Sequence, residues 1–173
     1  MKVILYAAMT TNGMVAKVDG NSDWPSKEDL ESFNNICRKS GGVIMGRKTF
    51  DIFNKGLIKD WPNADGLHIV LTNQETLKTT HPNIQFMKSP VEALRLAKAR
   101  GLDEVVVCGG SQIFGAFMKE KMIDEIYFDI EPLVFGKGMP LTNNENFESD
   151  LELIESKLLN KNTIQLHYKA IKV

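Results

Sequence analysis

The sequence has few of the residues that build metal centres. Its 173 residues include only two cysteines and three histidines, and none of them has the spacing of metal ligands. We expect Cys37 and Cys108 to be partly buried thiols, one in a helix and the other in a strand. The sequence therefore predicts no metal site.

Long hydrophobic runs and an excess of one charge are also missing. No apolar stretch approaches the ~20 residues that cross a membrane, and the first nine residues are too short and too strand-like for a signal peptide. A formal net charge of -1 gives no sign of a general nucleic-acid binder or a membrane-surface protein. We expect a cytoplasmic protein with a small-molecule substrate, and an anion site only where cations and backbone donors gather locally.

The composition that remains is that of an ordinary soluble globule, with 43% hydrophobic and 25% charged residues. At 173 residues the chain is long enough for one domain with a sizeable core and short for two. It contains no internal repeat and no convincing linker. We therefore expect a single domain over residues 1–173.

Apolar runs alternate with helical patterns along most of the chain. The expected strands are residues 2–9, 43–45, 67–72, 84–88, 104–110 and 125–132, the expected helices are 26–42, 48–53, 89–101 and 111–120, and residues 10–25 are expected to form a long loop. Residues 151–159 and 163–173 read as a hairpin. This order predicts a three-layer α/β fold: a mostly parallel central sheet covered on both faces, with an antiparallel C-terminal edge hairpin. Such sheets bind ligands beyond the carboxyl ends of their strands.

The stretch "VIMGRKTF" leaves a buried strand and enters a helix through Gly46. A helix that begins near Lys48 offers unpaired N–H groups and a favourable dipole to an anion. Arg47 and Lys48 add positive charge, and Thr49 adds a hydroxyl. The pattern indicates a phosphate site, although a polar helix start on the surface would look the same.

A second strand, "VVVCGG", ends in Gly109 and Gly110 before a helix that begins near Ser111. The glycines would let a ligand lie close to the backbone, and the helix aims its donors at the same place. The pair is also compatible with a tight turn. It gains weight because strand, turn and helix start follow one another as they do at Gly46.

Asp29 stands three residues after Ser26, at the start of a helix. One interpretation is structural, because Ser26 would cap the helix and Asp29 would complete a capping box. The other is functional, because a carboxyl group with apolar neighbours near this edge of the sheet could donate a proton to a bound heterocycle. The spacing favours neither, and the two are compatible.

These motifs together resemble the dihydrofolate reductase superfamily, which includes the reductase domain of riboflavin biosynthesis, over nearly the whole chain. The stretches 43–50 and 105–114 are similar to the dihydrofolate reductase signature and to the cofactor-binding glycine pair of that family. The interval from Trp24 to Asp29 is similar to the stretch that carries its single catalytic acid. Residues 122–141, "MIDEIYFDIEPLVFGKGMPL", are instead similar to the riboflavin-pathway relatives.

The resemblance implies a dihydrofolate reductase-like fold with NADPH lying across the carboxyl ends of the strands. Asp29, with Trp24, would form the catalytic stretch, and Asp29 would bind the ring of the substrate and assist its protonation. Residues 10–23 would act as a closing loop. The implied cofactor-binding residues are Ala8, Val15, Ala16, Gly46, Arg47, Lys48, Thr49, Leu71, Thr72, Asn73, Gly109, Gly110, Ser111, Gln112, Ile113 and Phe114. The implied substrate-binding residues are Tyr6, Leu30, Phe33, Phe53 and Asp129.

The sequence departs from the family pattern in two places. Dihydrofolate reductases hold the glutamate tail of the substrate with an arginine shortly before the third strand, where this chain has Lys59 as its nearest cation. A lysine lacks the bidentate fork of an arginine. In addition, Asp129 replaces the hydroxyl that supports the catalytic acid, so two carboxylates would share the site if Asp29 and Asp129 meet.

The resemblance leaves three functions open. The leading one is NADPH-dependent reduction of dihydrofolate to tetrahydrofolate. The second is NADPH-dependent reduction of 5-amino-6-(5-phosphoribosylamino)uracil in riboflavin biosynthesis, and the third is a non-catalytic dinucleotide-binding module. The expected oligomeric state, monomer or homodimer, depends on which branch of the superfamily the chain belongs to, because riboflavin-pathway reductases commonly form dimers.

Overall fold

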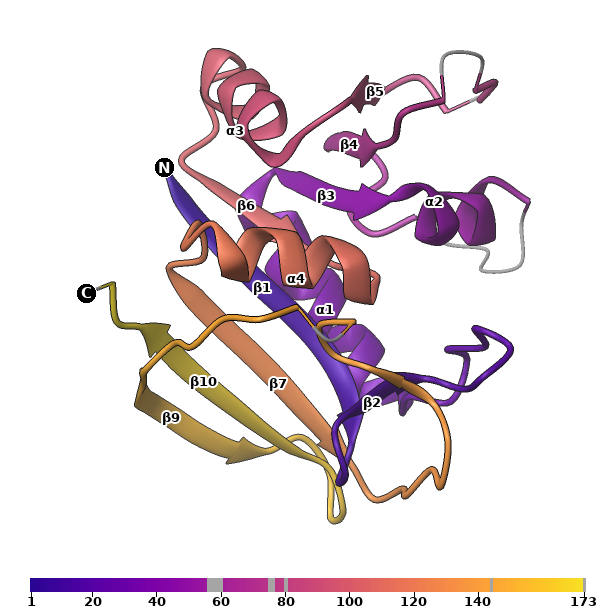
Figure 1. Cartoon of the computed structure of the whole chain (residues 1–173), viewed down its shortest axis with the longest axis vertical. Helices are drawn as coiled ribbons and strands as arrows, with labels where there is room; N and C mark the ends of the chain where they lie inside the picture. The colour runs from indigo at the N-terminus through magenta and orange to yellow at the C-terminus, as the bar shows by residue number, and fades with distance from the viewer. Residues whose placement is uncertain (56–60, 75–76, 80, 144, 173) are drawn as a thin grey trace.

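An eight-stranded sheet runs through the molecule, as the computed structural model of the chain shows in Figure 1. The structure describes residues 1–55, 61–74, 77–79, 81–143 and 145–172. From one edge to the other the strands are β5 (Ile84–Met87), β4 (Leu67–Leu71), β3 (Gly42–Gly46), β6 (Glu104–Val107), β1 (Lys2–Thr10), β7 (Glu125–Glu131), β10 (Ile164–Ala170) and β9 (Leu151–Leu158). The six strands from β5 to β7 are parallel, and β10 and β9 are antiparallel.

Helices cover both faces of this sheet and bury two apolar clusters. The helices α1 (Lys27–Ser40) and α2 (Arg47–Asn54) pack on one face, where Phe50 and Cys37 are buried against β3 and β6. The helices α3 (Pro90–Ala99) and α4 (Ser111–Lys119) cover the other face, where Ala97 and Phe117 are buried. The predicted fold class, a three-layer and mostly parallel sheet with an antiparallel C-terminal hairpin, is therefore confirmed.

Local signals placed the ends of two helices correctly. Ser26 precedes α1 and its hydroxyl accepts the N–H of Asp29 at 3.2 Å, and Ser89 accepts the N–H of Glu92 at 3.2 Å before α3. Such caps satisfy N–H groups that have no partner within the helix. The helix α3 ends at Ala99, just before Gly101, whose φ of 76° lies in the left-handed region.

The long loop expected over residues 10–25 was wrong in one respect. It contains a short strand, β2 (Met14–Ala16), which pairs with β8 (Met139–Pro140) in a second, two-stranded sheet. The side chain of Asn12 also donates to the carbonyl oxygen of Phe135 at 2.7 Å. The loop is therefore tied to the segment after β7. The expected cation Lys59 lies outside the described residues.

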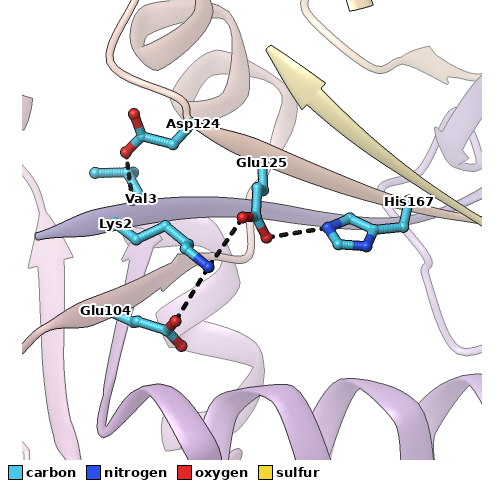
Figure 2. A network of polar contacts seen from close by, with 6 residues as sticks. All are labelled: Lys2, Val3, Glu104, Asp124, Glu125 and His167. Carbon is cyan, nitrogen blue, oxygen red and sulfur yellow. Dashed lines mark hydrogen bonds and ion pairs between the residues drawn. The ribbon is translucent and has the colours of Figure 1, made fainter. Parts of the chain in front are cut away.

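A network of polar side chains joins neighbouring strands at the opposite end of the sheet, where β1 begins (Figure 2). The ammonium of Lys2 lies 2.9 Å from a carboxylate oxygen of Glu125 and 3.3 Å from one of Glu104. The imidazole of His167 lies 3.0 Å from Glu125 and stacks on Tyr127, with ring centroids 4.0 Å apart. These contacts join β6, β1, β7 and β10 at the end away from the predicted ligand site.

Two expected absences can be examined in the described part of the chain. No helix there is long and apolar enough to cross a membrane. The same residues contain no group of three or more His, Cys, Asp or Glu side chains arranged to hold a metal ion.

Candidate functional site

A cavity of about 990 Å³ opens at the carboxyl ends of the parallel strands. This volume is at the upper end of the range of about 300–1,000 Å³ for ligand sites. The cavity has a predicted anion-binding end, where α2 and α4 begin, and an acidic end, where α1 passes β1. Its walls include the following predicted residues: Tyr6, Ala8, Val15, Ala16, Asp29, Leu30, Phe33, Gly46, Arg47, Lys48, Thr49, Phe53, Leu71, Thr72, Asn73, Gly110, Ser111, Gln112, Ile113 and Phe114.

The anion-binding end is built from two helix N-termini. Gly46 precedes α2 and Gly110 precedes α4, and neither helix has a side chain that caps its first turn. The first N–H groups of a helix have no partner within it, so both helices offer donors to a ligand in the cavity. Gly46 itself differs from the prediction, because its N–H donates to the carbonyl oxygen of Gly109 at 2.7 Å.

Close packing at these two turns explains the glycines. A Cβ atom on Gly46 would lie only 2.8 Å from Cγ1 of Ile113, so a larger residue would push the α2 and α4 turns apart. Gly109 has a φ of 108°, a conformation that other residues rarely adopt. The two glycine-containing motifs are therefore in direct contact through Gly46 and Gly109, which lie 63 positions apart in the sequence.

Some of the charged and polar side chains at this end already have partners within the protein. Arg47 forms an ion pair with Asp51, one turn further along α2. The hydroxyl of Thr72 accepts the N–H of Gln74 at 3.1 Å in the turn after β4. Arg47, Lys48, Thr72 and Asn73 all line the cavity, as predicted for a phosphate-binding end.

The acidic end centres on Asp29, whose residue surface is only 5% exposed. The hydroxyl oxygen of Tyr6 lies 2.9 Å from Oδ1 of Asp29 and 2.6 Å from Oδ2 of Asp129. Asp129 is fully buried on β7, next to β1. The two carboxyl groups whose meeting the sequence left open are therefore joined through one tyrosine hydroxyl.

The hydroxyl of Tyr6 lies between the two carboxyl groups. A single phenolic hydrogen can point at only one carboxyl group, and the shorter contact, to Asp129, is that of a charge-assisted hydrogen bond. The same hydroxyl is also within hydrogen-bond distance of Asp29, at 2.9 Å from Oδ1 and 3.0 Å from the backbone carbonyl oxygen, so it can donate to either acid. We infer that Asp29 is the protonated member of the pair and Asp129 the charged one.

The electrostatics of the pair agree with this arrangement. Burial, followed by the negative charge of Asp129, raises the pKa of Asp29 from 3.8 to about 8. Burial also raises the pKa of Asp129, but hydrogen bonds from Tyr6 and Gln165 oppose that shift. Burial likewise raises the pKa of Tyr6, which therefore stays a phenol and a donor.

Sequence reasoning missed the residues that hold the two acids in place. Gln165 on β10 donates to Oδ1 of Asp129 at 2.7 Å and to the hydroxyl of Ser32 on α1 at 2.8 Å. Asp129 and Gln165 are direct cross-strand neighbours. The available signal in the sequence was a polar residue within each of two predicted strands, Asp129 in one and Gln165 in the other. Only the pairing of the strands shows that the two side chains meet.

A second missed residue, Glu131, holds Ser26, the residue that caps the N-terminus of α1. Its carboxylate accepts the backbone N–H of Ser26 at 2.9 Å and the Ser26 hydroxyl at 2.7 Å, and it accepts the hydroxyl of Thr163 at 2.9 Å. The N–H that Asp29 would accept in a capping box is thus taken by Glu131. The capping-box interpretation of Asp29 is wrong, and its carboxyl group faces Tyr6 instead.

Three predicted site residues do not line the cavity. Trp24 packs edge-on against Phe135, with ring centroids 5.4 Å apart. Asp129 contacts Tyr6 and Gly109 contacts Gly46, so each touches a residue of the cavity wall without lining the cavity itself. Leu30 does line it, although 48% of the Leu30 surface is exposed to solvent.

The sheet, the antiparallel edge hairpin and the cavity across the strand ends define a dihydrofolate reductase-like fold. Residues 1–165 match the model of the RibD C-terminal domain, and the chain belongs to that family. The family places the chain among oxidoreductases.

Relatives of known sequence or structure extend over most of the chain. It is 31% identical to protein YwjB of Bacillus subtilis (strain 168), covering 96% of this chain and 97% of YwjB. It is 26% identical to a dihydrofolate reductase of Lactococcus lactis, over 62% of this chain and 60% of that enzyme.

Solved structures share the fold at lower identity. A protein from Shewanella sp. PV-4 that is named as a riboflavin biosynthesis protein superposes with a TM-score of 0.85 at 24% identity. The match covers 99% of this chain and 100% of that one. A Thermotoga maritima diaminohydroxyphosphoribosylaminopyrimidine deaminase/5-amino-6-(5-phosphoribosylamino)uracil reductase superposes with a TM-score of 0.76 at 20% identity, covering 98% of this chain and 56% of that one.

Proposed function

We propose that this protein is an NADPH-dependent reductase that transfers a hydride to a pterin, with dihydrofolate as the leading substrate. The observation that carries the proposal is the buried Asp29 at the end of the cavity, which contacts Tyr6 and lies close to Asp129, a setting that raises its pKa to about 8. A buried acid that keeps its proton near neutral pH is suited to protonate a bound ring nitrogen.

The anion-binding end fits a dinucleotide. The N-termini of α2 and α4 would hold its phosphates, with Lys48 and Thr49 beside them, and Asn73 would lie near the 2′-phosphate. Ala8, Val15 and Ala16 would border the nicotinamide between the two ends of the cavity. NADPH, when bound there, supplies the hydride.

The acidic end supplies the proton. Phe33 and Phe53 line the apolar walls against which a flat heterocycle can stack. The carboxyl group of Asp29 binds the ring and gives its proton to a ring nitrogen while the adjacent carbon receives the hydride, so that one C=N bond is reduced. Once Asp29 has lost its proton both carboxyl groups are charged, and the hydroxyl of Tyr6 can then turn from Asp129 to donate to Asp29.

A second candidate substrate is the aminouracil ribotide of riboflavin biosynthesis. It is favoured by the family match and by the absence of any arginine between Arg47 and Arg95, where a folate tail would be anchored. In this case the hydride would pass to a ribose carbon. The third possibility, a binding module without turnover, predicts that NADPH binds and that no substrate drives its oxidation.

The substrate question is tested by following NADPH oxidation by absorbance with dihydrofolate and, separately, with the ribotide. We expect turnover with dihydrofolate. We also expect a dihydropterin that lacks the glutamate tail to be reduced with a similar kcat/KM, because the chain has no arginine fork to recognise that tail. Turnover of the ribotide alone would replace the leading substrate by the second one, and binding of NADPH without any turnover would leave only the binding module.

The Asp129→Asn variant tests the pairing of the two acids. The charge of Asp129 raises the pKa of Asp29, so its removal should lower that pKa from about 8. The active form has a protonated Asp29, and its activity is present below this pKa and lost above it. We therefore expect the alkaline limb of the kcat/KM profile to move to lower pH in the variant; an unchanged limb would show that the Asp129 charge does not act on Asp29.

A further inference from the structure

Asp29 and Asp129 share much of their polar surroundings. The hydroxyl of Tyr6 lies within hydrogen-bond distance of both acids, at 2.9 Å from Asp29 and 2.6 Å from Asp129. Glu131 on β7 also faces the pair, and its negative charge raises the pKa of both acids. Neither Tyr6 nor Glu131 acts on one acid alone, so a different group must decide which acid keeps the proton.

The start of α1 favours a charge on Asp29 rather than on Asp129. Asp29 is the third residue of α1, and the N-terminus of a helix stabilises a negative charge in its first turn. Asp129 lies within β7, between β1 and β10 (Figure 1), and a sheet has only a small net dipole. A neutral Asp29 beside a charged Asp129 therefore requires a group that favours the charge on Asp129 alone.

The side-chain amide of Gln165 is a hydrogen-bond donor to Asp129. Its Nε2 donates to Oδ1 of Asp129 at 2.7 Å and to the hydroxyl oxygen of Ser32 at 2.8 Å, so both hydrogens of the amide are used. An amide nitrogen donates only, which makes Oδ1 of Asp129 the acceptor. Gln165 is only 2% exposed, and its direct pairing with Asp129 across β10 and β7 fixes the contact.

We propose that Gln165 is the positioning residue that keeps the charge on Asp129 and thereby leaves the proton on Asp29. Oδ1 of Asp129 accepts from Gln165 and Oδ2 accepts from Tyr6, so both carboxylate oxygens have donors. Hydrogen bonds of this kind favour the charged form of an acid. Gln165 does not line the cavity and acts through Asp129. This role rests on the proposed function, because it takes Asp29 as the group that protonates the bound ring.

NMR of the aspartate carboxyl carbons in the ligand-free protein tests where the proton lies. The signals of the two acids are assigned with the Asp29→Asn and Asp129→Asn variants and followed with pH. In the wild type we expect Asp129 to ionise at lower pH than Asp29, whose midpoint should lie near 8. In Gln165→Met, which lacks the donor, Asp129 should keep its proton to higher pH, and the midpoint of Asp29 should fall by at least about one pH unit.

The pH profile of kcat/KM gives a second readout. The active form has a protonated Asp29, so activity is lost above its pKa, and the alkaline limb should move to lower pH in Gln165→Met. Combining this variant with Asp129→Asn should add no further shift, because Gln165 acts through a charge that Asp129→Asn already lacks. A merely structural role would lower kcat without moving the limb.

Matched variants separate this effect from a general disturbance of the sheet. Gln85→Met makes the same change on β5, at the far edge of the sheet, and should leave both midpoints as in the wild type. Gln165→Leu is a second donor-free variant should the methionine variant fail to fold. A wild type in which Asp29 ionises before Asp129, or a donor-free variant with an unchanged Asp29 midpoint, would overturn the role of Gln165. The expected NMR result without any turnover would uphold that role and count against the proposed function alone.

Discussion

Replacement of Asp29 by asparagine is expected to lower kcat by about 10²-fold or more, within the range that general acid catalysis contributes. The asparagine keeps the shape of the acid and can still contact Tyr6, but it has no proton to give to a ring nitrogen. NADPH affinity should change little, because Asp29 lies at the end of the cavity away from the N-termini of α2 and α4. Single-turnover kinetics and fluorescence titration with NADPH would measure the two quantities separately.

Glu31→Gln is the matched control for this variant. Glu31 lies two residues further along α1, is exposed, and undergoes the same change from carboxyl to amide. Its kcat should remain close to that of the wild type. Equal losses in the two variants would mean that the amide change disturbs α1, and an Asp29→Asn variant with full activity would remove Asp29 from the proton-transfer step.

The same Asp29→Asn variant is expected to be more stable than the wild type at neutral pH. The pKa of Asp29 is about 8 in the folded protein, compared with 3.8 for an unperturbed aspartate, the value we take for the unfolded chain. Between these values the folded state holds a proton that the unfolded state has released, so wild-type stability falls as pH rises from about 4 to about 8. Each pKa unit is worth about 1.4 kcal/mol, which gives a gain of about 4 kcal/mol for the variant at pH 7.

Urea unfolding at a series of pH values would measure this gain. The difference in the free energy of unfolding between variant and wild type should be small near pH 4, grow with pH and level off above pH 8. Charges elsewhere in the chain are common to both proteins and cancel in the difference. A difference that is independent of pH would show that Asp29 ionises in the folded protein as readily as in the unfolded one.

The combination of lost turnover and gained stability would be informative about the site. Asp129, Tyr6 and Asp29 place two carboxyl groups around one hydroxyl in a buried setting, which costs folding free energy. Active sites commonly retain such costs because the chemistry needs a shifted pKa. A merely structural acid would be expected to stabilise the fold, so replacing it would lower stability.

Local patterns predicted most of the elements and the anion-binding end. Ser26 and Ser89 mark helix starts because a hydroxyl accepts an N–H three residues away, a contact that depends only on neighbouring sequence. Gly46 and Gly110 could be recognised because each follows an apolar strand and precedes a helical pattern. The pairing of β2 with β8 could not, because strands of three and two residues in polar loops leave no periodic signal.

The sequence alone was sufficient for most of the strands and helices and for the fold class, because periodicity, caps and glycine turns are short-range, whereas most of the residues expected at the cavity came from the resemblance to a known family. The tertiary structure was needed for the state of the acid. Tyr6 and Asp129 are 123 positions apart, and only the register of β1, β7 and β10 places them with Gln165 around Asp29. A pKa depends on burial and on neighbouring charge, and both are properties of the assembled fold.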